Sequence, residues 1–161
     1  MKRERFVRNL VFGVEDSLVS TVGFISGIAA ASVNRRTLLL SGIVLICVEA
    51  FSMGIGSIVS EESALEAKTK KRVSWSGPIA GGLVMFASYI LTGALVLLPY
   101  FTRDVASALP QSIAVSLTLL FLLGAVSAFM SGLPVLLRAV RMMVVGGLAI
   151  VLGVFVGSAM P

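Results

Sequence analysis

Residues 46–63, ICVEAFSMGIGSIVSEES, place a carboxylate in the middle of a long apolar run. Met53 follows Glu49 by one helical turn, so a helix presents both side chains on one face. Burying an ionisable group in lipid costs roughly 2.5–3.5 kcal/mol even on lenient insertion scales, which makes Glu49 a functional candidate. The same stretch is rich in small residues that let another helix approach closely: Ser52, Gly54, Gly56, Ser57 and Ser60. We expect this face to pack against a second acidic helix.

The composition predicts an integral membrane protein. Of the 161 residues, 57% are hydrophobic and only 13% are charged, which excludes an ordinary soluble protein. Several apolar runs reach the roughly 20 residues needed to cross a bilayer. We predict one all-helical (all-α) domain, residues 1–161, a polytopic membrane protein with five transmembrane helices at about 10–31, 37–60, 77–101, 111–131 and 142–159. The first half of the charged loop 61–76 is expected to continue the second helix, residues 101–110 to form a short turn, and residues 133–141 to be a link.

Basic residues are unequally divided between the two sides of the predicted membrane. Three of them, Arg35, Arg36 and Arg103, fall on one side, and the other ten fall on the side of the N-terminus and of loop 61–76. Cytoplasmic loops carry the excess of Lys and Arg, so we expect a cytoplasmic N-terminus and an external or luminal C-terminus. The net charge of +5 is then attributed to loops that face anionic lipid, and no nucleic-acid partner is expected.

The chain lacks the residues that several classes of function require. The chain has no His, so Ser–His and Cys–His catalytic pairs are excluded. No Gly-rich phosphate loop follows a strand, and we predict neither an enzyme nor a bound cofactor. The single cysteine, Cys47, is interpreted as a small core residue. Two small-xxx-small pairs, Gly23 with Gly27 and Gly153 with Gly157, are expected to pack helices.

The acidic residues cluster on the first two predicted spans. From a rise of 1.5 Å per residue, Asp16 lies roughly 9 Å and Met53 roughly 10 Å inside the same membrane face, so the two are expected to face each other. Glu49 lies one turn deeper. A ladder of carboxylate, thioether and carboxylate suits Fe²⁺, Mn²⁺ or Zn²⁺, because the softer sulfur disfavours Mg²⁺ and Ca²⁺. A low-dielectric pore also favours protonated carboxylates, so metal and protons would compete for the same oxygens.

Other acidic residues have two readings. Glu15 points about 100° away from Asp16, either to the cytoplasmic interface or to the entrance of the path. A second group, Glu61, Glu62 and Glu66, forms either a solvated helix face, which composition favours, or a metal-collecting entrance above the pore.

The motifs resemble those of the vacuolar iron transporter family of Fe²⁺ and Mn²⁺ transporters. The first span, FGVEDSLVSTVGFISGIAAA, is similar to its G-x-(N/S)-D-G-L-V pattern, and EAFSMGIGSIVSEES to its S-M-(G/A)-x-G-x-Y pattern. The third span, WSGPIAGGLVMFASYILTGALVLLPYF, ends in a similar L-L-P-Y, and LFLLGAVSAFMSGLPVLLRAVRMMVVGGLAIVLGVFVG resembles the terminal pair.

This resemblance implies a homodimer whose ion path lies at the dimer interface, lined by the first two spans of each subunit. Asp16 stands at the position of the family's membrane aspartate and Met53 at that of its pore methionine. Transport in the family exchanges metal leaving the cytoplasm for protons, across a plasma membrane or a vacuole-like membrane. Two departures stand out: Leu45 occupies the usual position of the second-span glutamate, one turn from Glu49, and loop 61–76 is too short for the Glu-rich metal-binding domain of some members.

The sequence therefore predicts a metal ladder of Asp16, Met53 and Glu49, with Glu15 and Glu61, Glu62 and Glu66 as weaker candidates. Two other functions stay open from the residues alone. One is a proton-coupled exporter of another small cation, and the other is a membrane interaction protein that transports nothing.

Overall fold

The computed structural model describes residues 2–159, and the predicted all-helical fold is confirmed: these residues form five helices and no strand. Each helix is long and apolar enough to cross a membrane, as predicted for a multi-pass membrane protein. The helices are α1 (Lys2–Ala30), α2 (Arg35–Thr69), α3 (Ser76–Thr102), α4 (Val105–Ser131) and α5 (Val135–Ala159).

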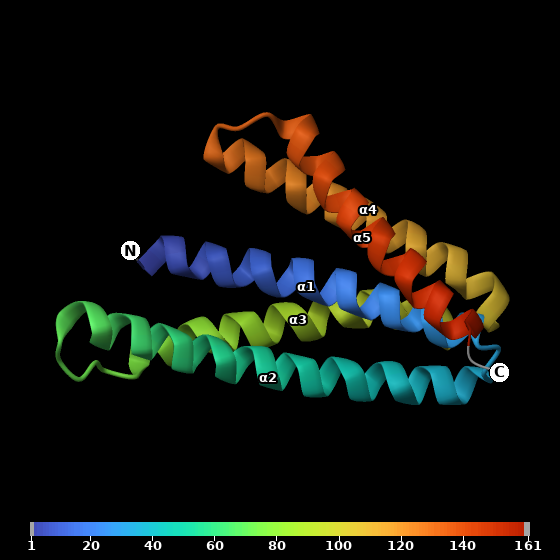
Figure 1. Cartoon of the computed structure of the whole chain (residues 1–161), viewed down its shortest axis with the longest axis horizontal. Coiled ribbons are helices and arrows are strands. Elements are labelled where there is room, and N and C mark those ends of the chain that lie inside the picture. The colour runs from blue at the N-terminus through green and yellow to red at the C-terminus, as the bar shows by residue number, and fades with distance from the viewer. Residues whose placement is uncertain (1, 160–161) are drawn as a thin grey trace.

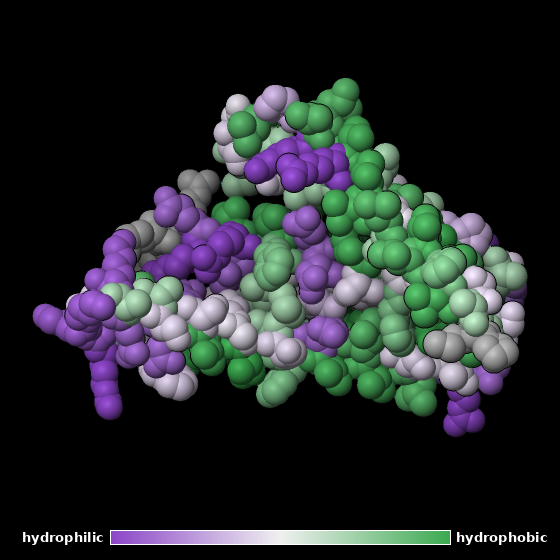
Figure 2. Space-filling model, in the orientation of Figure 1, coloured by the Kyte–Doolittle hydropathy of each residue, from purple (hydrophilic) through white to green (hydrophobic). Residues whose placement is uncertain are grey.

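The helices run up and down between two ends of an elongated bundle (Figure 1). One end holds the start of α1 and the connections α2–α3 and α4–α5; we call it the basic end, because most Lys and Arg residues lie there. The hairpin of α4 and α5 packs against α1 near the opposite end and diverges from α1–α3 toward the basic end. Figure 2 shows most hydrophilic side chains gathered at the basic end, smaller hydrophilic patches in the middle and at the opposite end, and hydrophobic surface between them, which fits burial of much of the bundle in lipid.

Two connections are shorter than the sequence predicted. As expected, α2 continues past the apolar run, to Thr69. The predicted turn over residues 101–110 was wrong, since only residues 103 and 104 separate α3 from α4. Asp104 explains the early start of α4, because its carboxylate accepts a hydrogen bond of 3.2 Å from the backbone N–H of Ser107. The link predicted over 133–141 is likewise helical from Val135 onward.

The Asp104 cap makes stability depend on pH. Hydrogen bonds from Ser107, first from its side chain and then from its backbone, lower the pKa of Asp104 from its usual value of 3.8. A group whose pKa is lower in the folded state than in the unfolded state stabilises the fold fully at any pH above its unfolded-state pKa. This stabilisation is lost as the pH falls through the folded-state pKa. Between about pH 5 and pH 3, the Tm of the wild type should therefore fall more than that of Asp104→Ala.

Asp104→Asn is the matched control for this prediction, because Asn caps helices as well as Asp does but does not titrate. Its Tm should resemble that of the wild type at neutral pH and should lack the acid-dependent loss. Equal acid sensitivity of all three proteins in a thermal-unfolding series would contradict the assignment of the effect to this cap.

The helices meet along two kinds of surface. A hydrophobic core joins α1, α2 and α3 around Tyr89 and Tyr100, both fully buried. Between α1 and α5 the contact is instead backbone to backbone: a Cβ on Gly153 would lie 1.9 Å from the carbonyl oxygen of Gly23, and one on Gly157 would lie 2.0 Å from that of Gly27. The predicted packing role of the two glycine pairs is confirmed, since each pair faces the other.

The interpretation of Cys47 as a core residue was wrong. Cys47 is exposed on the outer face of α2, which also exposes the large apolar side chains Val48 and Phe51. Hydrophobicity does not distinguish a core face from a lipid-facing one, because the membrane interior is as apolar as the core. The buried face of α2 consists instead of Leu38, Gly42, Ile46, Ala50, Gly54, Ser57 and Glu61.

Candidate functional site

Asp16 on α1 and Glu49 on α2 form a pair of like charges within the helices. Both side chains are partly buried, and the charge of Glu49 acts directly on Asp16. In the part of the chain that the structure describes, no Lys or Arg lies within ion-pair distance of either carboxylate. Two partly buried carboxylates without a cation repel each other when both are ionised, so the pair favours binding of a cation.

Tyr89 on α3 completes this group. Its hydroxyl shares a hydrogen bond of 2.5 Å with Ser20, and its backbone carbonyl accepts one of 2.8 Å from Ser17. The phenol lies within electrostatic reach of both Asp16 and Glu49. Sequence reasoning gave Tyr89 no role, although a tyrosine inside an apolar span signals a polar partner, because a buried phenol hydroxyl needs one.

Met53 lies nearer the basic end than the acid pair. Its partly buried side chain contacts the core around Tyr89 and lines a cavity of about 560 Å³. The α1 residues in that cavity are Arg8, Asn9 and Phe12, which precede Asp16 by about one to two helical turns. The structure brings Glu49 within electrostatic reach of Asp16, and Met53 lies about one turn nearer the basic end on α2.

Glu15 faces a different neighbour from Asp16. The charged groups that act on Glu15 are Asp16 and Arg138 of α5. Arg138 also donates a hydrogen bond of 3.3 Å to the hydroxyl of Ser127 on α4. Glu15 thus lies on the side of α1 that faces the diverging α4–α5 hairpin, and its neighbouring cation distinguishes it from Asp16.

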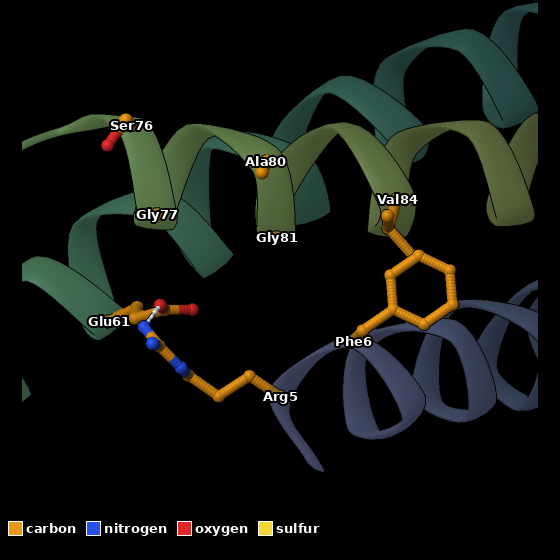
Figure 3. A pocket seen from close by; sticks show the side chains of 8 residues that line it. All are labelled: Arg5, Phe6, Glu61, Ser76, Gly77, Ala80, Gly81 and Val84. Carbon is orange, nitrogen blue, oxygen red and sulfur yellow. Dashed lines mark hydrogen bonds and ion pairs between the residues drawn. The ribbon is translucent and has the colours of Figure 1, made fainter. Parts of the chain in front are cut away.

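The three acidic residues at the end of α2 do not share one environment. Glu61 is buried and forms an ion pair with Arg5 of α1 (Figure 3), whereas Glu62 and Glu66 are partly exposed. The solvated face that composition favoured therefore does not include Glu61. Its burial follows from position, because Glu61 continues the buried face one turn after Ser57.

Beyond Glu49, toward the opposite end, a cavity of about 370 Å³ lies between α1 and α2. Glu49, Ser41 and Leu45 line it from α2, and Phe24 lines it from α1. Polar side chains and cavities thus follow one another along the first two helices, in the order Glu61, Met53, Asp16 with Glu49, and Ser41.

No complete metal site is present in residues 2–159 of one chain, since no three His, Cys, Asp or Glu side chains come together there. A divalent ion between Asp16 and Glu49 would need further ligands. Hydroxyl groups, the thioether, water or a second copy of the chain can supply them.

Comparison with known proteins matches the sequence of this chain to a family. The family model described as "VIT family" matches residues 7–76 and 66–158, which together include nearly the whole chain. The chain belongs to the VIT family. Among curated VIT relatives, "Vacuolar iron transporter homolog 1" of Oryza sativa subsp. japonica is 31% identical over 91% of this chain and 70% of its own length. "Vacuolar iron transporter homolog 4" of Arabidopsis thaliana is 29% identical over 92% of this chain and 80% of its own length. The resemblance noted in the motifs is confirmed.

Proposed function

We propose that this VIT-family chain transports Fe²⁺, and also Mn²⁺, from the cytoplasm across its membrane in exchange for protons. The names of its relatives support iron as the substrate. The observation that supports the mechanism most directly is the pair of Asp16 and Glu49, two partly buried carboxylates without a Lys or Arg partner, inside helices that can span a membrane.

The direction of transport follows from charge. The basic end faces the cytoplasm, because cytoplasmic loops carry the excess of Lys and Arg. Metal enters there, passes Met53, and reaches Asp16 and Glu49 before leaving toward Ser41 and the external or luminal side. Met53 favours transition metals over Mg²⁺ and Ca²⁺ because a thioether is a soft ligand.

Exchange for protons follows from the same two carboxylates. A metal ion and a proton neutralise the pair in turn, and neither can bind while the other occupies the oxygens. An acidic luminal side protonates Asp16 and Glu49 and expels the metal, and the cytoplasmic side takes up the proton and offers the next ion. This cycle needs no covalent chemistry, in keeping with a transporter rather than an enzyme.

A homodimer is part of this proposal. The cavity that Met53 lines also includes the exposed residues Ser52, Gly56 and Ser60, so a second copy can pack closely against it. Two copies would bring four carboxylates and two thioethers to one path and complete the ligand set that one chain lacks. Mass measurement of the detergent-solubilised protein by light scattering tests this, and a monomer that still transports metal would contradict it.

The decisive experiment measures metal entry into liposomes that contain the purified protein. Fe²⁺ under anaerobic conditions, Mn²⁺, Zn²⁺ and Mg²⁺ are offered outside, with the lumen either at the external pH or more acidic. We expect Fe²⁺ and Mn²⁺ to enter, Mg²⁺ to stay outside, and the acidic lumen to accelerate entry. A protonophore should remove the acceleration.

The other outcomes identify the alternatives. Entry that does not respond to the pH gradient would remove the exchange mechanism but keep metal transport. No entry of any metal, in a folded preparation with both orientations present, would contradict transport of metal. Uptake of a small organic cation by that same preparation would then favour a different exporter.

A further inference from the structure

At the basic end, a partly buried ion pair joins α1 to α2. The guanidinium of Arg5 reaches one carboxylate oxygen of Glu61, as Figure 3 shows. Glu61 is only 5% exposed, and within residues 2–159 its other oxygen, Oε2, has no hydrogen-bond partner. A buried carboxylate that leaves one oxygen unsatisfied is unusual, because such oxygens normally bind a donor, a water molecule or an ion.

Two more buried polar groups near this oxygen are unsatisfied. Asn9 of α1 is 1% exposed, and Ser57, one turn before Glu61, is 8% exposed. Among the described residues, neither the side-chain nitrogen of Asn9 nor the hydroxyl of Ser57 has a hydrogen-bond partner. Asn9 and Glu61 share one space, because a Cβ on Gly81 would lie 2.6 Å from Asn9 Nδ2 and 3.0 Å from Glu61 Oε2. The missing side chain of Gly81 leaves that space open.

The residues of this group line two cavities. The outer one, of about 460 Å³, is lined by Arg5, Glu61 and Gly81 among others. The inner one holds Asn9 and Ser57 together with Met53. Glu61 thus lies at the outer cavity, and Asn9 and Ser57 lie at the cavity of Met53.

We propose that Glu61, Asn9 and Ser57 form an entry site for a hard divalent cation, and that Arg5 competes with the cation for Glu61. This inference rests on the proposed function. A carboxylate, a carboxamide turned to present its oxygen, and a hydroxyl are the oxygen ligands that such cations prefer. While Arg5 is paired with Glu61, the charge of the carboxylate is neutralised and attracts a metal ion weakly. When Arg5 withdraws, the site carries the full negative charge of Glu61.

The proposal predicts that removing the cation of residue 5 increases metal affinity. The test uses Mn²⁺ alone and measures equilibrium binding to purified protein in a background that carries both Asp16→Asn and Glu49→Gln, so that the deeper carboxylate pair does not contribute. Adding Arg5→Gln should strengthen Mn²⁺ binding at least about tenfold, because a competing cation is lost from a buried carboxylate. Adding Glu61→Gln as well should abolish the gain.

A control and a second variant keep the test decisive. Arg72→Gln removes an exposed cation from the same end of the bundle and should change binding little, which measures the effect of net charge alone. Asn9→Asp adds a carboxylate to the site while Arg5 stays in place, so it should also strengthen binding even where Arg5→Gln folds poorly.

Each outcome decides the inference. Unchanged Mn²⁺ affinity in both Arg5→Gln and Asn9→Asp, or a gain that persists with Glu61→Gln, would show that Arg5 and Glu61 only hold the helices together. Because binding at equilibrium requires no transport, this failure is distinct from failure of the proposed function: wild-type liposomes that transport Fe²⁺ would leave that function intact.

Discussion

Asp16→Asn is expected to reduce Fe²⁺ entry into liposomes by at least about two orders of magnitude. Mutation of a residue that only holds a metal ligand in place already changes metal affinity by about 10–100-fold, and here a proposed ligand and its charge are removed. The protein should still fold, since the substitution also relieves repulsion between Asp16 and Glu49. Initial rates of metal entry, with thermal unfolding in detergent measured alongside, provide the readout.

Glu15→Gln is the matched control, because Glu15 is the adjacent carboxylate on the same helix but faces Arg138. Its effect on entry should be at most several-fold. Asp16→Asn with wild-type flux would remove the central ligand from the proposed mechanism. Equal losses in both variants would mean that charge near the path matters, and that the pairing with Glu49 does not.

Gly153→Ala is expected to have the largest effect on stability. The added Cβ would stand 1.9 Å from the carbonyl oxygen of Gly23, and a backbone atom cannot yield as the end of a flexible side chain can. Forcing α5 away from α1 should cost about 1–3 kcal/mol or more. The apparent Tm in detergent should fall, and metal entry should fall with it, because α1 also positions Asp16.

Gly147→Ala makes the same chemical change six residues earlier in α5, where a Cβ would meet no atom within 4 Å. The exchange should leave Tm unchanged or raise it, since Ala is the better helix former by up to about 1 kcal/mol. A Tm for Gly153→Ala as high as that of Gly147→Ala would show that the two helices do not pack as closely as the structure has them.

The fold was predictable because a segment that crosses a lipid bilayer must be apolar and of a fixed minimum length. An apolar run of about 20 residues has few alternatives to a helix when its backbone must satisfy its own hydrogen bonds. The number of helices and the continuation of α2 to Thr69 were correct for that reason. The error over residues 101–110 had a local cause. Asp104 and Pro110 are residues typical of a turn, but in this structure Asp104 caps the start of α4 and Pro110 lies inside that helix.

The metal-binding roles of the predicted residues stay predictions, and the relative depth of these residues depends on packing between helices. Depth was counted from the predicted span ends at residues 10 and 60, but α1 starts at Lys2 and α2 ends at Thr69. Contacts between helices decide which residues are level: they bring Glu49 within electrostatic reach of Asp16 and place Met53 on the cavity that Asn9 and Phe12 line. Only packing could reveal that.

The burial of Glu61 was predictable from the sequence, but its proximity to Asn9 was not. Burial of Glu61 follows from the helical period that leads through Gly54 and Ser57, so that signal was present in the sequence. No sequence signal placed Asn9 beside Glu61, because their proximity depends on the space at Gly81 of a third helix.

The exposure of Cys47 has a practical consequence. Because Cys47 is the only cysteine and lies on the outer face of α2, one thiol-reactive spin label attaches there without any mutagenesis. Pulsed electron paramagnetic resonance on the labelled protein in detergent then reads the separation of the two labels if two copies pair through α2. A sharp distance distribution would define the geometry of that pairing, and the absence of any dipolar signal at short range would place the α2 helices of neighbouring copies apart.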